Sequence, residues 1–288
     1  MNSNVTKNET RTATLLMILV AILWSLGGIC IKLISWNALT IACIRGLIAG
    51  SLMFAYAKKK GFAPKFNKYT WIISIGMMLC MTLFTIANKL TTAANAIVIQ
   101  YLCPVWVLLI GVIIYKQKAR RMDITAVVIC IAGIALFFMD QLSPGNMLGN
   151  VVAIGSGIAM ATMFVGNNKC NDTDVQYTGL IMGHFMTFIA GLAGFFIEPF
   201  HPAMSEIGLI FVLGILQIGI PYILFAYVST KISPLACSLI GMLEPMLNPV
   251  WVAIFYGEVP GFFALIGGAI IIVTTSVWCV LQNRPADM

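Results

Sequence analysis

Charged residues are scarce in this chain of 288 residues. Asp, Glu, Lys and Arg make up 9% of it, while 60% of the residues are hydrophobic. A soluble domain carries about 25% charged and roughly 45–50% apolar residues. The composition therefore excludes a soluble enzyme, a nucleic-acid-binding protein and a disordered chain. The apolar runs do not alternate as barrel strands must, so the sequence predicts an all-α integral membrane protein.

Residues that carry enzyme or metal chemistry are also few. There are two histidines, and the chain contains no phosphate-binding glycine loop with lysine, no nucleophile elbow and no pair of carboxylates within an apolar run. None of the eight cysteines forms a C-x-x-C pair, so we expect small buried apolar residues and not disulfides or metal ligands. The sequence predicts no enzyme, no metal site and no cofactor, and an ion or substrate gradient as the energy source.

The few charges divide the chain into ten apolar segments, most of them close to the roughly 20 residues that a bilayer-spanning helix needs. Two of these segments contain one charge each, Arg45 in the second and Glu244 in the ninth. The shortest segment is the fifth. The predicted spans are residues 12–31, 38–57, 69–88, 90–115, 124–139, 141–168, 175–197, 207–230, 233–256 and 259–283.

The distribution of Lys and Arg between the two faces predicts the orientation, because cytoplasmic loops carry an excess of basic residues. With the N-terminus inside, the opposite face receives only Lys32 and Lys89. We therefore expect both termini in the cytoplasm of a bacterial cell, and a multi-pass protein of its cytoplasmic membrane. The net charge of +7 then needs no nucleic-acid partner. The basic residues on the predicted cytoplasmic face are Lys7, Arg11, Lys58, Lys59, Lys60, Lys65, Lys68, Lys116, Lys118, Arg120, Arg121, Lys169, Lys231 and Arg284.

Ten spans divide into two groups of five, residues 1–141 and 142–288. Because five is odd, the second group starts from the opposite face, and any internal repeat is inverted. Placing residues 92–115 over 233–256 aligns Leu102-Cys103-Pro104 with Leu243-Glu244-Pro245. Inverted repeats with broken helices at matching positions point to a transporter's substrate site near the middle of the membrane.

Proline gives the physical reason to expect these breaks. A proline inside a helix removes one hydrogen bond and displaces the carbonyl four residues earlier, here that of Gln100 for Pro104 and that of Gly241 for Pro245. An unsatisfied carbonyl within the membrane must face protein or a water-filled cavity. We expect Pro104 and Pro245 to line a central cavity; the alternative is a pair of kinks that only shape packing. Pro221 predicts a third break.

Two segments carry a family resemblance. The segment LTTAANAIVIQYLCPVWVLLIGVIIYKQK, residues 90–118, resembles the fourth helix of the EamA-type transporters of the drug/metabolite transporter superfamily. The segment SPLACSLIGMLEPMLNPVWVAIFYGE, residues 233–258, is similar to their ninth helix. Trp24, Arg45 and Gly149-Asn150 also sit where that family places such residues.

The resemblance implies two inverted five-helix repeats around a central cavity, with alternating access for a small metabolite. Members of the family export amino acids, dyes or drugs, and some import nutrients. This sequence departs from the family pattern in that Cys103 stands opposite Glu244, and Asn150 replaces a frequent acid. A mechanism that needs an acid in both halves is therefore in doubt.

Glu244 is the only acid well inside a predicted span, and an intramembrane charge is a functional candidate by default. It can attract a cationic or amino group, bind a driving proton, or form a fixed pair with Arg45 or His184. Arg45 can bind a substrate carboxylate, neutralise Glu244, or extend along its stem toward the membrane surface. His184 can be a hydrogen-bonded packing residue or take part in proton or substrate binding.

The remaining candidates for substrate binding surround the two predicted breaks or add aromatic area. Aromatic rings can stack on a substrate ring or hold a cation; for any single ring, core packing is the alternative. With Glu244, the predicted substrate-binding residues are Gln100, Tyr101 and Trp106 on the fourth span, Met242 and Asn248 on the ninth, Trp24 on the first and Tyr222 on the eighth.

These observations favour a secondary active transporter for a small polar metabolite, an amino acid or an amine-containing compound, that works as an exporter or exchanger. Protons are a candidate coupling ion, and the lipid bilayer is the surrounding partner. One alternative is an organic-cation, quaternary-ammonium or drug transporter of the same fold. An alternative of another class is a passive channel or a membrane subunit of a larger assembly.

Overall fold

A computed structural model describes residues 6–27, 30, 33–91, 93–137, 139, 146–170, 172–198, 200–256 and 261–282. Within these ranges the side chains of residues 88, 89, 93–95, 248–250, 252, 253, 255, 256 and 282 are not described. Over these ranges the chain is helical, without a strand, so the prediction of an all-α membrane protein agrees with the structure.

The helices follow the order of the predicted spans. In the first half they are α1 (Lys7–Ser25), α3 (Ala38–Lys59), α4 (Lys68–Leu90), α5 (Ala93–Gln100), α6 (Cys103–Ile113) and α7 (Arg121–Phe137). In the second half they are α8 (Met147–Lys169), α9 (Thr173–Gly191), α10 (Gly194–Ile197), α11 (Met204–Val212), the π-helical segment η1 (Leu213–Gly219), α12 (Ile220–Lys231), α13 (Pro234–Gly241), α14 (Leu243–Tyr256) and α15 (Phe262–Gln282).

Seven helical segments in the described ranges are long and apolar enough to cross a membrane. The three other predicted spans correspond to α1, α7 and the pair α13–α14, of which α7 has only 17 residues. Ten membrane crossings and an inverted repeat therefore stay predictions, while a helical protein with several membrane-spanning helices is shown.

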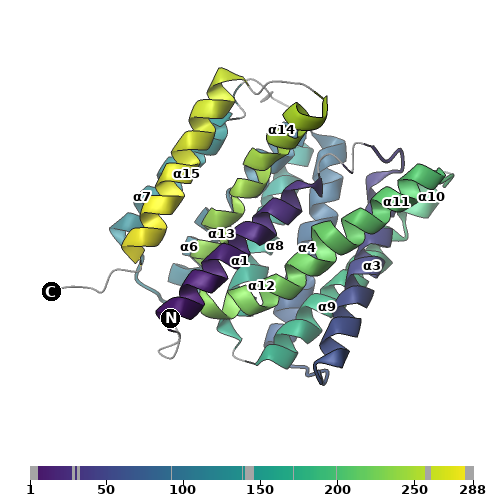
Figure 1. Ribbon diagram of the computed structural model, residues 1–288, viewed down its shortest axis with the longest axis horizontal. Coiled ribbons are helices and arrows are strands. Elements are labelled where there is room, and N and C mark those ends of the chain that lie inside the picture. The colour runs from purple at the N-terminus through teal and green to yellow at the C-terminus, as the bar shows by residue number, and fades with distance from the viewer. Residues whose placement is uncertain are drawn as a thin grey trace.

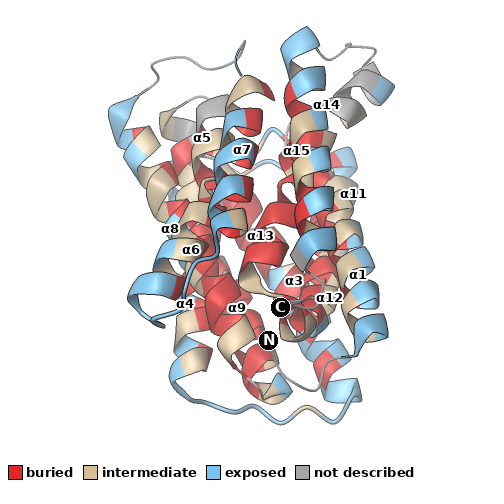
Figure 2. Ribbon diagram, turned by 90° about the vertical axis from the view of Figure 1, so that its left-hand side faces the viewer, coloured by how far each residue is buried: buried red, intermediate tan, exposed pale blue. Residues whose placement is uncertain are grey.

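The helices form one bundle whose apolar outer surface suits contact with lipid. Figure 1 shows α7 and α15 side by side at one edge and α3 with α9 at the opposite edge, in agreement with the helix contacts. Figure 2 shows the buried residues gathered on the inner sides of the helices, with exposed residues on the outer sides and at the ends. Seven of the eight cysteines are buried.

Small residues let the central helices approach closely, as is usual between membrane helices. A Cβ added at Gly183 of α9 would lie 2.6 Å from the Cβ of Met77 on α4. A Cβ at Gly76 of α4 would lie 3.1 Å from the carbonyl oxygen of Ala159 on α8. The sequence places glycine where α4 contacts both α8 and α9, and this contact joins the two halves of the chain.

Pro221 does not break its helix as predicted. The chain stays helical through η1 into α12, and the N–H of Ile220 bonds to the carbonyl of Ile215, five residues earlier. In a π-helical turn the hydrogen bonds run from i to i+5, so the wider turn accommodates the carbonyls that a proline would otherwise displace. Proline and the glycines before it therefore produce a widened helix here, and not an interruption.

An ion pair fastens the start of α1 to the end of α12. Lys231 Nζ lies 2.6 Å from the Glu9 carboxylate, which also accepts the Thr6 backbone N–H at 2.9 Å. The bond from Lys231, and then those from Thr6, lower the pKa of Glu9 from 4.5 to about 2. Because the folded pKa lies below the unfolded one, this contact stabilises the fold above about pH 4.5, and the contribution is lost as pH falls toward 2.

We therefore expect Glu9→Gln to lower the thermal unfolding midpoint by a few degrees at most at pH 7. The difference from the wild type shrinks at pH 3. Unfolding curves of both proteins at the two pH values measure this. Glu198→Gln is the matched control, because Glu198 makes no ion pair among the residues that the structure describes. A Glu9→Gln difference that is equal at pH 7 and pH 3 would contradict the assignment.

Candidate functional site

Two helices are interrupted at corresponding places in the two halves. α5 ends at Gln100 and α6 begins at Cys103, while α13 ends at Gly241 and α14 begins at Leu243. The ends at Gln100 and Gly241 are the residues whose carbonyls Pro104 and Pro245 displace. Each proline lies in the first turn of the following helix, where its missing N–H costs no hydrogen bond.

Tyr101 and Glu244 connect the two interruptions. Tyr101 lies in the turn between α5 and α6 and is 2% exposed. Its hydroxyl donates a hydrogen bond to Glu244 Oε2, in the first turn of α14. The two residues are 143 positions apart in the chain, so this bond joins the halves at the centre of the bundle.

Arg45 is buried near Glu244 without forming an ion pair with it. The guanidinium and the carboxylate attract each other, but in the described ranges none of the ion pairs within 4.0 Å involves either residue. Arg45 Nη2 lies 3.9 Å from the sulfur of Met81, and Nε has no hydrogen-bond partner among the residues that the structure describes. One predicted alternative was a fixed ion pair of Glu244 with Arg45 or His184. The described residues contain no such pair.

A cluster of aromatic rings packs beside these charges. Tyr222 on α12 lies 5.3 Å from Trp24 on α1 and 5.1 Å from His184 on α9, measured between ring centroids. Phe225 adds a ring 6.0 Å from Trp24, and Phe164 of α8 lies 5.0 Å from Phe225. All five are buried. The structure thus brings together Trp24, Tyr222 and His184, which the sequence predicted separately.

Three predicted residues have other surroundings. Gln100 donates to Ser156 Oγ at 2.7 Å and lies 3.7 Å from Cys80 Sγ, so its amide nitrogen is satisfied by the protein. Met242 is fully buried in the turn between α13 and α14. The side chain of Asn248 lies outside the described residues.

Several buried polar atoms in this region have no hydrogen-bond partner within the described structure. A buried donor or acceptor left unpaired costs about 1–3 kcal/mol, so each such atom needs an explanation, for example an ordered water, an ion or a bound polar molecule. Thr82 and Gln217 were not among the predicted site residues, because a lone hydroxyl or amide in an apolar helix is common. The atoms are Trp24 Nε1, Arg45 Nε, Thr82 Oγ1, Trp106 Nε1, His184 Nε2 and Gln217 Oε1.

Comparison with known proteins assigns the family. The sequence profile of the EamA-like transporter family matches residues 11–139 and 147–279. The chain belongs to this family. The EamA family is part of the drug/metabolite transporter superfamily, so the resemblance found in the sequence is confirmed. Membership in this family supports a role as a membrane transporter.

Relatives of this EamA protein are similar along most of its length. An uncharacterized transporter of Archaeoglobus fulgidus is 25% identical over 286 residues, which cover 94% of this chain and 98% of the relative. The uncharacterized transporter YxxF of Bacillus subtilis is 26% identical over 213 residues, 69% of this chain and 65% of the relative. A protein crystal structure with 18% identity has a TM-score of 0.82 and covers 96% of this chain and 99% of that one, which shows that the two share a fold.

The site of this EamA protein combines three kinds of group in the interior of the bundle. Glu244 supplies a negative charge, Arg45 a positive charge with an unused N–H, and Trp24 with Tyr222 an aromatic surface. Such a set can hold a small molecule that carries both an ammonium and a carboxylate group beside an apolar body.

Proposed function

We propose that the chain is a secondary active transporter for a free amino acid or a similar small zwitterion, working by alternating access as an exporter or exchanger. The observation that carries this proposal is the pair Glu244 and Arg45. Arg45 is buried and Glu244 is half-buried, and their charges are opposite, yet Glu244 bonds to Tyr101 and Arg45 keeps an N–H without a partner among the described residues. A charge of each sign is then available to a substrate with an amino and a carboxylate group.

Two inverted repeats, residues 1–141 and 142–288, belong to the same proposal. The two ranges matched by the family profile, 11–139 and 147–279, support it. The helix contacts support it as well, since α1 packs on α12 as α8 packs on α4, and α3 packs on η1 as α9 packs on α4. If the chain crosses the membrane ten times, the excess of Lys and Arg on one face supports an orientation with both termini in the cytoplasm of a bacterial cell.

An organic-cation transporter is the second candidate. The rings of Trp24 and Tyr222 beside one carboxylate would suit a quaternary ammonium ion. Arg45 favours the amino acid, because a buried guanidinium repels a cation and binds a carboxylate. A passive channel has no observation in its favour.

The test is counterflow in proteoliposomes loaded with an unlabelled amino acid, using a panel of labelled amino acids and the matching amino-acid amides. We expect saturable exchange with a preference of at least about tenfold for the free acid over its amide, as for a hydrogen-bonded charge. Arg45→Gln removes the charge that binds the substrate's carboxylate, so the preference for the free acid over its amide falls to about onefold. Equal transport of acids and amides by the wild type would favour the organic cation, and flux that never saturates would indicate a channel.

A further inference from the structure

A pocket of about 340 Å³ lies at the basic end of the bundle, away from the site around Glu244. This end carries the turn after α6 with residues 116–121, the end of α8 and the start of α13. Both halves enclose the pocket, since α6 and α7 contribute from the first and α8, α13 and α15 from the second. Its volume is at the lower end of the range of about 300–1,000 Å³ for small-molecule sites.

The floor of the pocket is apolar. Val107 of α6, Val165 of α8, Leu235 of α13 and Trp278 of α15 line it, and each is buried. The indole N–H of Trp278 donates to Asp123 Oδ1 at 3.0 Å, so this ring is held in place and its polar atom is satisfied. Apolar carbon therefore faces the inner part of the pocket.

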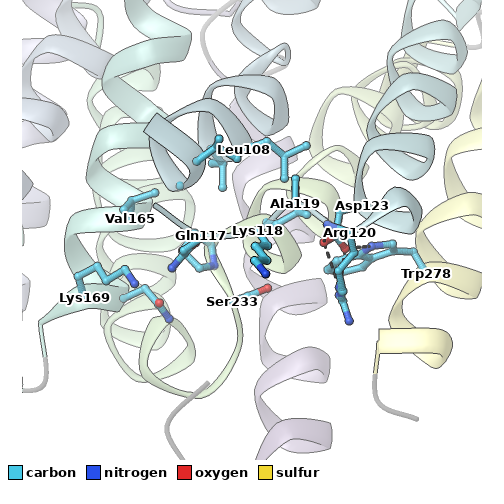
Figure 3. Close-up of a pocket in the computed structure, with 16 residues that line it drawn as sticks. Leu108, Gln117, Lys118, Ala119, Arg120, Asp123, Val165, Lys169, Ser233 and Trp278 are labelled. Atoms are coloured by element: carbon cyan, nitrogen blue, oxygen red, sulfur yellow. Dashed lines mark hydrogen bonds and ion pairs between the residues drawn. The ribbon is translucent and has the colours of Figure 1, made fainter. Parts of the chain in front are cut away.

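The rim of the pocket is cationic. Arg120 is neutralised by Asp123, whose carboxylate lies 2.9 Å from Arg120 Nη2. Lys118 is exposed and forms no ion pair among the described residues, and the ammonium of Lys169 lies 4.8 Å from the centroid of the Tyr115 ring. In Figure 3, Lys118 lies between Lys169 and the Arg120–Asp123 pair. Two lysine charges on the rim thus have no acidic partner in the described part of the chain.

We propose that this pocket binds a small amphipathic anion, with an apolar or aromatic body on the floor and a phosphate or carboxylate group at Lys118 and Lys169. The buried apolar floor suits the apolar body of such a ligand, and the two ammonium groups without acidic partners suit its anionic group. Neither Tyr101 nor Glu244 lines the pocket, and the lining residues nearest to them in the chain, Val107 and Leu235, are six and nine residues away. It is therefore a second site, separate from the one proposed for transport.

Because both halves line the pocket, its ligand stabilises the arrangement of α6, α8 and α13 seen in this structure. A soluble metabolite and an anionic phospholipid headgroup share the required chemistry. If the basic face is cytoplasmic, as proposed above, both sources are present on that side of the membrane.

Thermal unfolding of the purified full-length protein tests the site, with phenyl phosphate as the probe. A ligand that binds only the folded state raises the unfolding midpoint with concentration. We expect phenyl phosphate to stabilise the wild type at lower concentration than phenol or inorganic phosphate at equal ionic strength. Lys118→Gln raises the concentration needed by at least about fivefold, a typical effect of losing one charged contact.

Lys116→Gln is the matched control, because Lys116 carries the same charge two residues away and does not line the pocket. It leaves the response to phenyl phosphate unchanged. Glu244→Gln also leaves it unchanged, so a failure of the proposed transport function is distinguishable from a failure of this site. The proposal would be overturned if Lys118→Gln and Lys116→Gln responded identically to phenyl phosphate. It would also be overturned if phenyl phosphate stabilised the wild type no better than phenol or inorganic phosphate.

The two ligand sources are separated in lipid nanodiscs of phosphatidylcholine with and without phosphatidylglycerol. If the headgroup occupies the pocket, phosphatidylglycerol stabilises the wild type more than Lys118→Gln and weakens the effect of phenyl phosphate. If the ligand is a soluble anion, phenyl phosphate acts equally in both lipids. Either result supports the site, while no Lys118-dependent stabilisation by probe or lipid excludes it.

Discussion

A Glu244→Gln variant is expected to lose at least about 30-fold in transport efficiency for free amino acids, while still folding. Removing one member of a buried group of charges costs about 2–5 kcal/mol, or roughly 30-fold and more in affinity. Glutamine keeps the shape of the side chain and can still accept the hydrogen bond from Tyr101. The expected loss therefore reports the charge that holds the substrate's ammonium group.

The measurement is counterflow in proteoliposomes, with the folded state checked by its unfolding midpoint. Tyr101→Phe keeps the carboxylate and removes one hydrogen bond, so we expect a smaller loss of roughly three- to tenfold. Glu198→Gln, at an acid outside the bundle centre, leaves transport unchanged. Full transport by Glu244→Gln would contradict the assignment of this residue to substrate binding.

The same variant tests proton coupling. If Glu244 carries the driving proton, Glu244→Gln no longer accumulates substrate against its gradient when a pH difference is imposed. Its exchange of substrate falls less than this accumulation does. If the variant still concentrates its substrate with the pH dependence of the wild type, Glu244 has no part in proton coupling.

Gly267→Ala is expected to cause a large loss of stability. A Cβ at this position of α15 would lie 2.5 Å from the carbonyl oxygen of Gly133 and 2.5 Å from the backbone nitrogen of Phe137, both on α7. Backbone atoms cannot rotate out of the way as a side chain can, so α7 and α15 must separate. Overpacking of this kind costs about 3 kcal/mol, which corresponds to a fall of roughly 6–12 °C in the unfolding midpoint.

Gly208→Ala is the matched control for the glycine variant. Gly208 lies in α11, and a Cβ there would have no atom within 4 Å. Alanine favours the helix over glycine by about 1 kcal/mol, so the unfolding midpoint stays the same or rises slightly. Equal destabilisation by both variants would show that the close contact between α7 and α15 is not the cause.

Much of the helical arrangement could be predicted from local features of the sequence. The span predicted at residues 38–57 is α3 (Ala38–Lys59), and that at 69–88 is α4 (Lys68–Leu90). The uncharged length that a bilayer needs and the charges that end it are local properties. The interruptions before Pro104 and Pro245 are also local, because proline displaces the carbonyl four residues earlier in the same helix.

Contacts between distant segments could not be predicted in this way. Gln100 was a candidate for substrate binding, yet it donates to Ser156 of α8, and no sequence pattern indicates which of two adjacent polar residues finds a protein partner. Pro221 was expected to break its helix, but the outcome depends on whether the turn can widen, and here η1 does so.

Three properties could be predicted without the structure: the protein is helical, it lies in a membrane, and it belongs among transporters of the EamA type. These properties follow from composition, from the spacing of charges and from the order of motifs, none of which requires knowledge of contacts. Only the packed structure shows that Tyr101 bonds to Glu244, and that Arg45, whose charge acts on Glu244, forms no ion pair among the described residues. The physical reason is that these residues come from α3 and from two interrupted helices in different halves of the chain, and only packing of the helices sets the distances between them.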